Sequence, residues 1–60
     1  MRVTDANAAI RIGRWALDNR EILPDQVRLD IAHIAERGSQ KLMAGLRDDE
    51  LATLRGAPRS

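Results

Sequence analysis

Pro24 is the only proline among the first 57 residues, and it interrupts a sequence whose signals are otherwise helical. A proline disfavours the α conformation in the residue before it, so the preceding helix has to end at or before Leu23. Proline also suits the first turn of a new helix, where Asp25 would face the positive end of the helix dipole. The stretch ILPDQ is therefore predicted to be a tight connection between two helices that pack antiparallel.

Three helices and no strand are predicted, because no segment of four or more residues alternates between apolar and polar side chains. The helices are expected over residues about 5–21, about 24–46 and about 49–55, in a single all-α domain that spans residues 1–60. Thr4 or Asp5 is a suitable N-cap for the first helix, and Asp48 for the third. The tail 56–60, which contains Gly and Pro, is expected to be frayed.

Gly38 leaves two interpretations of the second helix open. It could end a helix in the left-handed conformation, with Ser39 capping the next helix. It could instead lie inside one long helix, at a cost of about 1 kcal/mol relative to Ala. The apolar spacing keeps its phase from Ile31 to Leu42, and a break would normally shift it. A continuous helix to about residue 46 is therefore favoured.

Each long helix carries two apolar stripes when residues are placed about 100° apart. The main stripe of the first helix contains the only aromatic side chain and comprises Ala8, Ile12, Trp15, Ala16 and Asn19. Its narrower stripe comprises Ala6, Ile10, Gly13 and Leu17. The main stripe of the second helix comprises Val27, Ile31, Ile34, Ala35, Gly38, Leu42 and Gly45, and the weaker one Leu29, Ala32 and Met43.

One stripe from each helix is enough to form the core of a hairpin. We expect the two main stripes to meet there, with the core anchored by Trp15, Ile12, Ile31 and Ile34. The weaker stripes then need another surface, and a two-fold symmetric homodimer that forms a four-helix bundle is the simplest way to cover them. Docking onto a different protein is the alternative. The predicted protein interface consists of Ile10, Gly13, Leu17, Leu29 and Met43.

The size and composition of the chain also favour a partner. A chain of 60 residues buries only about 60% of the surface that its unfolded form exposes, so a monomer has marginal stability. The absence of cysteine excludes disulfides and thiolate zinc sites, which leaves oligomerisation as the common route to stability. The chain shows neither the apolar run of a signal peptide nor a run of about 18 apolar residues. We therefore expect a cytoplasmic protein that does not bind membranes.

Residues suited to catalysis or metal binding are few. Asp30 and Glu36 stand three residues before and after His33, a spacing that could hold a metal on one side of a helix. The first helix supplies no inward carboxylate on its main stripe beyond Asp5, so His33 is expected to be solvated. Ser39 lies six residues after His33, too far for a hydrogen bond along one helix. We therefore expect no enzymatic activity, no metal and no cofactor.

DNA binding is the alternative function. Residues 31–46, IAHIAERGSQKLMAGL, resemble the helix-turn-helix proteins, with Gly38 in the turn and Gln40 and Lys41 opening a recognition helix. The resemblance covers about a quarter of the chain, and it departs from the motif at Ile34, Ser39 and Ala44. The DNA-binding alternative would place Arg11, Arg14, Arg37, Gln40 and Lys41 on phosphates or bases. The net charge of +1 adds little support for a nucleic-acid partner.

These exclusions, together with the spare apolar stripes, favour a binding function. We expect a small non-enzymatic protein of bacterial or phage type that binds another protein stoichiometrically, as a regulator, inhibitor or adaptor. Homodimerisation is the first expected interaction, and a DNA-binding transcriptional regulator remains the alternative.

Overall fold

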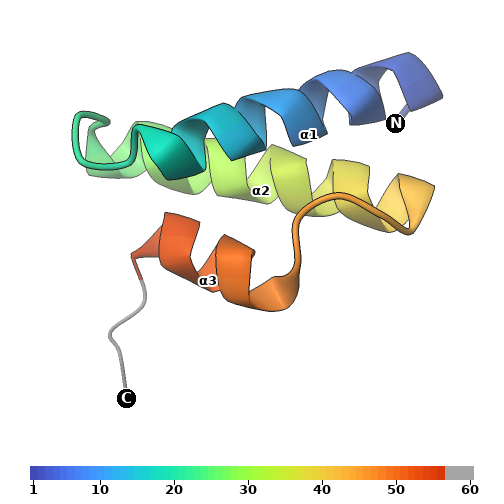
Figure 1. The fold of residues 1–60 in the computed structure, drawn as a ribbon. Helices are drawn as coiled ribbons and strands as arrows, with labels where there is room; N and C mark the ends of the chain where they lie inside the picture. Colours follow the sequence, from blue (N-terminus) through green and yellow to red (C-terminus); the bar gives the residue numbers. More distant parts are fainter. Residues whose placement is uncertain (57–60) are drawn as a thin grey trace.

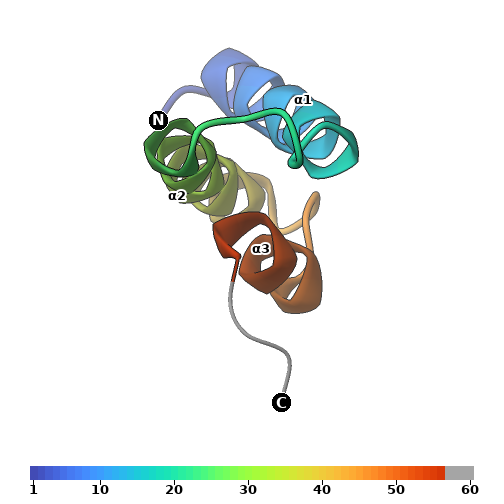
Figure 2. The same cartoon turned by 90° about the vertical axis from the view of Figure 1, so that its left-hand side faces the viewer.

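Three helices make up most of residues 1–56, the part of the chain that the structure, a computed structural model, describes. They are α1 (Val3–Asp18), α2 (Asp25–Leu42) and α3 (Asp48–Arg55). No strand occurs within residues 1–56, so the predicted all-α class is confirmed. α1 and α2 run antiparallel and side by side, and α3 runs back beneath α2 (Figures 1 and 2).

The connection between α1 and α2 is longer than predicted, because α1 ends at Asp18 instead of near residue 21. Asn19 leaves the helix with a φ of −115°, and its side-chain amide donates a hydrogen bond to the carbonyl oxygen of Trp15 over 2.8 Å. Pro24 stands at the N-cap position of α2 in an extended conformation, with a ψ of 147°. The proline therefore sets the start of α2, and Asn19 sets the end of α1.

The second helix is continuous through Gly38, but it ends at Leu42 instead of near residue 46. Met43 adopts the left-handed conformation, with a φ of 51°, and the amide of Ala44 donates to the carbonyl of Ser39 over 3.0 Å. Gly45 follows with a φ of 106°, and Leu46 is then buried in the core. The apolar residues of the sequence continue beyond the end of α2 at Leu42 because the loop places the side chain of Leu46 in the core.

Ser39 ties this loop to α2. Its buried hydroxyl donates to the carbonyl of Ala35 over 2.7 Å and accepts a hydrogen bond from the amide of Leu46 over 3.0 Å. Both the donor and an acceptor site of the hydroxyl are thus satisfied within the protein, as a buried polar group requires. The bond to Leu46 holds the loop at the point where it turns towards α3.

Small residues bring α1 and α2 into close contact. A methyl group on Gly38 would lie 2.8 Å from the carbonyl oxygen of Ala6 and 3.1 Å from the Cβ of Ala9. A methyl group on Gly13 would lie 2.7 Å from the Cβ of Ala35. The distances of 2.8 Å at Gly38 and 2.7 Å at Gly13 are shorter than the van der Waals contact of a methyl carbon. Each glycine therefore occupies a position where only a hydrogen atom fits.

This packing corrects the predicted core. Trp15, Ile12 and Ile34 lie at the surface, with 50%, 42% and 38% of their area exposed, whereas Ile31 is buried. A large side chain between α1 and α2 would hold the two backbones apart where the glycines bring them together. The small residues Ala6, Ala9, Gly13 and Ala16 are therefore the buried side of α1, whereas Ile12 and Trp15 of the predicted main stripe face outward.

The stripe expected to bind another chain is largely covered within this one. Gly13 is buried beside Leu46, whose two Cδ atoms lie 3.2 and 3.3 Å from the position of a Gly13 methyl group. Ile10 and Leu17 are half-buried and pack against the core. Only Leu29 and Met43 of the five predicted interface residues are exposed. The α2–α3 loop and α3 thus take the place that the sequence pattern suggested for a partner.

Candidate interaction surface

The large side chains that the core leaves out gather on one side of the hairpin. Ile12 and Trp15 are three residues apart on α1, while Val27 and Ile34 are seven apart on α2. Both spacings return to the same side of a helix. Ile12 and Ile34 also line a common hollow, so the two pairs face the same surface. We call these four residues the apolar face; between 38% and 50% of each is exposed.

A shallow hollow of about 310 Å³ opens in the apolar face towards the start of α1. Its walls are almost wholly apolar, and they are formed by Met1, Asp5, Ala8, Ala9, Ile12 and Ile34. The hollow exists because α1 presents the small side chain of Ala8 one turn before Ile12. Trp15 lies on the other side of Ile12, so the apolar face is recessed towards one end and raised towards the other.

Charged side chains border the apolar face unevenly. Arg37 and Lys41 lie three and seven residues after Ile34, on the half of α2 that is near the start of α1. Asp30 lies four residues before Ile34, and Asp18 ends α1, so both lie towards the opposite end. All four are exposed, and none forms an ion pair within residues 1–56. Along α2 the surface therefore has a basic end and an acidic end, while Asp5 of α1 adds a carboxylate at the basic end.

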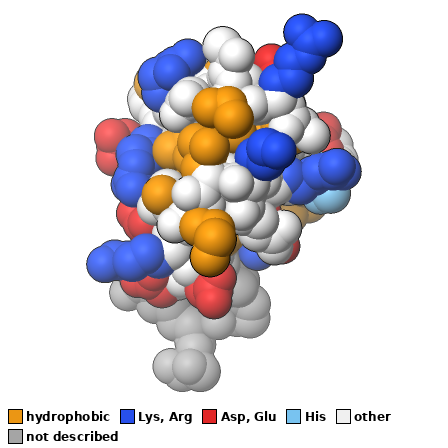
Figure 3. Space-filling view, turned by 90° about the vertical axis from the view of Figure 1, so that its right-hand side faces the viewer, with side chains coloured by type: hydrophobic (Ala, Val, Ile, Leu, Met, Phe, Trp, Pro, Cys, Tyr) orange, Lys and Arg blue, Asp and Glu red, His pale blue; other side chains and the backbone are white. Residues whose placement is uncertain are grey.

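Figure 3 views the end of the hairpin at which α1 begins and α2 ends. Hydrophobic side chains gather near the centre of this view, and Lys and Arg side chains border them on several sides. An apolar patch with a charged border is typical of a protein interface, in which the centre is desolvated and the rim stays wet; this patch is at the end of the hairpin, whereas the apolar face runs along the helices.

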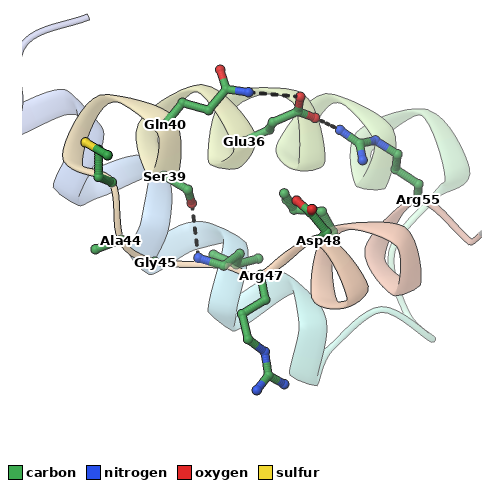
Figure 4. Close-up of a pocket in the computed structure, with 11 residues that line it drawn as sticks. Glu36, Ser39, Gln40, Ala44, Gly45, Arg47, Asp48 and Arg55 are labelled. Atoms are coloured by element: carbon green, nitrogen blue, oxygen red, sulfur yellow. Dashed lines mark hydrogen bonds and ion pairs between the residues drawn. The ribbon is translucent and has the colours of Figure 1, made fainter.

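A second hollow, of about 440 Å³, lies between α2, the α2–α3 loop and α3 (Figure 4). Two of its charged groups pair with each other: Arg55 of α3 forms an ion pair with Glu36 of α2, and Glu36 also accepts a long hydrogen bond of 3.5 Å from Gln40. The hydroxyl of Ser39, at the edge of the hollow, is bonded to backbone groups and not to a base. These contacts fasten α3 to α2 and do not form a nucleophile with an activating base.

The five residues expected to contact nucleic acid are divided between α1 and α2, and one of them is engaged within the chain. Arg14 forms an ion pair with Glu50 over 3.3 Å and donates to the carbonyl of Gly45 over 2.9 Å, so it holds α3 against α1. Gly38 lies inside α2, which places Gln40 and Lys41 in the last turn of that helix instead of at the start of a new one. Arg11 lies on α1, while Arg37 lies beside Lys41 on α2. The geometry of a helix-turn-helix is therefore not present at this segment.

His33 is exposed on α2, and no group of three or more His, Cys, Asp or Glu side chains within residues 1–56 is placed to hold a metal ion. None of the helices in the same range combines the length and the apolar character that crossing a bilayer requires.

Residue size was the signal that could have identified the apolar face from the sequence. The narrow stripe of α1 contains Ala6 and Gly13, and Gly38 lies on α2, so these stripes allow the closest approach of two helices. Hydrophobicity alone ranked the stripe with Trp15 first, because it counts apolar area and ignores the distance between helix axes.

In comparisons with known proteins, no family model matches the chain, and neither a curated protein nor a solved structure shows significant similarity to it.

Proposed function

We propose that this chain is a non-enzymatic protein that acts stoichiometrically, as a regulator, inhibitor or adaptor, by packing its apolar face against another protein chain. The observation that carries the proposal is the position of Trp15. This side chain is the only aromatic one in the protein, and half of it is exposed within the apolar face. Tryptophan is enriched at the energetic centres of interfaces, where it buries a large rigid area.

The distribution of large apolar side chains supports this proposal. Four are buried within residues 1–56, namely Ile31, Leu46, Leu51 and Leu54. Nine are exposed, namely Met1, Val3, Ile12, Trp15, Ile22, Val27, Leu29, Ile34 and Met43. Complete burial of one such side chain contributes about 1.5–3 kcal/mol. More large apolar side chains are thus exposed than buried, and the apolar face is where several of the exposed ones adjoin.

A partner that presents two helices to the apolar face would complete a four-helix bundle with α1 and α2. The sequence pattern favoured such a bundle through the weaker stripes. The exposure of the four residues of the apolar face supports its formation through that face instead. α3 would then lie outside the bundle, because the core contacts of Leu51 and Leu54 place it on another side of α2.

The test is the substitution Ile12→Glu, which puts a charge at the centre of the apolar face. Because Ile12 is exposed in the single chain, the helical fold should persist in circular dichroism while association is lost. Ile22→Glu is the matched control, since Ile22 is 74% exposed in the α1–α2 connection and outside the apolar face. Sedimentation equilibrium measures self-association. Affinity purification with the same three proteins measures binding to any other chain.

Association that persists in the wild type and Ile22→Glu but not in Ile12→Glu would support the proposal. Association that is equal in all three proteins, or absent in all three, would contradict it. A gel shift with DNA at low salt that survives Ile12→Glu would instead favour the DNA-binding alternative, since phosphate contacts do not depend on an apolar face.

A further inference from the structure

We infer that the chain bound by the apolar face is a second copy of this protein, packed with its helices antiparallel so that α1 faces α1 and α2 faces α2. This inference rests on the proposed function and names its partner. Two independent features of the apolar face carry it, namely its shape and the placement of its charges.

Ile12 and Ile34 lie at nearly the same level of the hairpin, within roughly 3 Å along the helix axes, because Gly13 and Ala35 are in contact and the helices run antiparallel. A two-fold axis perpendicular to the helices at this level exchanges the two copies. A residue on one side of the axis then faces, in the other copy, the residue that lies at the same distance on the other side. Isologous contacts of this kind require the surface to be complementary to itself.

The shape of the apolar face meets this requirement. At about 1.5 Å per residue, Trp15 lies roughly 4.5 Å beyond Ile12, and Ala8 lies roughly 6 Å before it. The two-fold operation therefore brings Trp15 of one copy over Ala8 of the other. Ala8 lines the apolar hollow of about 310 Å³. The indole of Trp15, the largest side chain of the apolar face, therefore enters the hollow of the other copy. Two such contacts form, one on each side of the axis.

The charges obey the same symmetry. Asp30 lies four residues before Ile34 and Arg37 three residues after it, roughly 6 and 4.5 Å from the axis. The two-fold operation places Asp30 of one copy near Arg37 of the other, with Lys41 one turn further along. A two-fold axis parallel to the helices would instead place α1 of one copy against α2 of the other, and Asp30 would not meet Arg37. Charge complementarity between Asp30 and Arg37 thus favours the antiparallel arrangement.

An exchange of charges tests the orientation. Asp30→Arg alone and Arg37→Asp alone should each weaken the dimer about tenfold, because every dimer contains two such contacts and each single change makes both repulsive. The double variant Asp30→Arg/Arg37→Asp restores opposite charges and should return the dissociation constant to within about threefold of the wild type. High salt should weaken the wild-type dimer and strengthen both single variants.

Filling the recess tests the shape. Ala8→Leu should weaken the dimer about tenfold or more, because Trp15 of the other copy loses its place. Asn7→Leu is the matched control, since Asn7 is exposed on the adjoining polar side of α1, and it should leave the dimer unchanged. Trp15 itself reports dimer formation, as its emission shifts to shorter wavelength on burial and the chain has no Tyr or Phe to interfere.

The outcomes separate this inference from the proposed function. Single charge variants that bind like the wild type, a double variant that is not restored, or an Ala8→Leu dimer of wild-type affinity would each overturn the antiparallel dimer. If Ile12→Glu still abolishes association in those cases, the proposed function stands. A wild-type protein that stays monomeric but binds another protein, with that binding lost in Ile12→Glu, would likewise overturn the dimer and leave the proposed function standing. A dimer insensitive to Ile12→Glu would overturn both.

Discussion

Ser39 is the one polar side chain that the described part of the chain buries. Its hydroxyl joins the carbonyl of Ala35 to the amide of Leu46, so a single oxygen atom links α2 to the loop that follows it. The sequence resemblance to a helix-turn-helix treated Ser39 as a departure from an apolar position. In the structure Ser39 has its own role, because the polar group is needed where the chain leaves α2.

Ser39→Ala should lower the free energy of unfolding by about 1–3 kcal/mol, because the buried amide of Leu46 loses its acceptor. Thr53→Ala is the matched control. The hydroxyl of Thr53 also donates to the carbonyl four residues earlier, Asp49, but it is exposed, so its loss should cost about 0.5 kcal/mol or less. Urea denaturation of the three proteins measures the difference, and equal losses for the two variants would show that Ser39 does not hold the loop.

At the scale of the elements, close approach decides how α1 and α2 pack. Gly13 and Gly38 leave room for the backbone and Cβ atoms of the facing helix, and alanines fill the rest of the contact. Two ion pairs then hold α3 in place, between Arg14 and Glu50 on one side and between Glu36 and Arg55 on the other. Neither pair follows from sequence spacing, because each joins residues of different helices.

Gly38→Ala should destabilise the protein by about 1–2 kcal/mol. An alanine in an open helix position would gain about 1 kcal/mol in helix propensity, but here the methyl group meets the carbonyl oxygen of Ala6, and the backbone cannot yield without separating the helices. Asn7→Ala provides the open position for comparison, since Asn7 is exposed on α1, and it should be neutral or slightly stabilising. Thermal unfolding followed by circular dichroism measures both. A Gly38→Ala protein as stable as Asn7→Ala would contradict the close packing.

The whole molecule has a small core and a large apolar surface. Within residues 1–56, Leu54 is the only large side chain that is fully buried, and alanines supply much of the remaining core. If the chain associates as proposed, the removal of apolar area from water would add to the stability that a chain of 60 residues can reach alone.

The melting temperature should consequently depend on protein concentration. For a dimer of chains of this size, a roughly hundredfold increase in concentration should raise the melting temperature by about 10 °C, because association is part of the folding equilibrium. Ile12→Glu should melt at a lower temperature that does not change with concentration. A wild-type melting temperature that is constant over this range would show that the isolated chain carries its own stability.

The local features of the fold could be predicted from the sequence. Pro24 predicted where the second helix begins, and the unbroken apolar phase predicted that this helix continues through Gly38. The end of that helix at Leu42 could not be predicted in the same way. It depends on the left-handed conformation of Met43 and on the bond between Ser39 and Leu46, which forms only when the loop folds back on α2.

The sequence by itself determined that the chain forms helices and that each long helix has two apolar stripes, because both depend on residue spacing along one element. Only the tertiary structure decided which stripe is inside. Gly13 and Gly38 let the helices approach on their small residues, the α2–α3 loop and α3 covered Ile10 and Leu17, and Trp15 was left on the surface. The physical reason is that burial depends on how closely two helices approach, and that distance belongs to the pair of helices and not to either sequence alone.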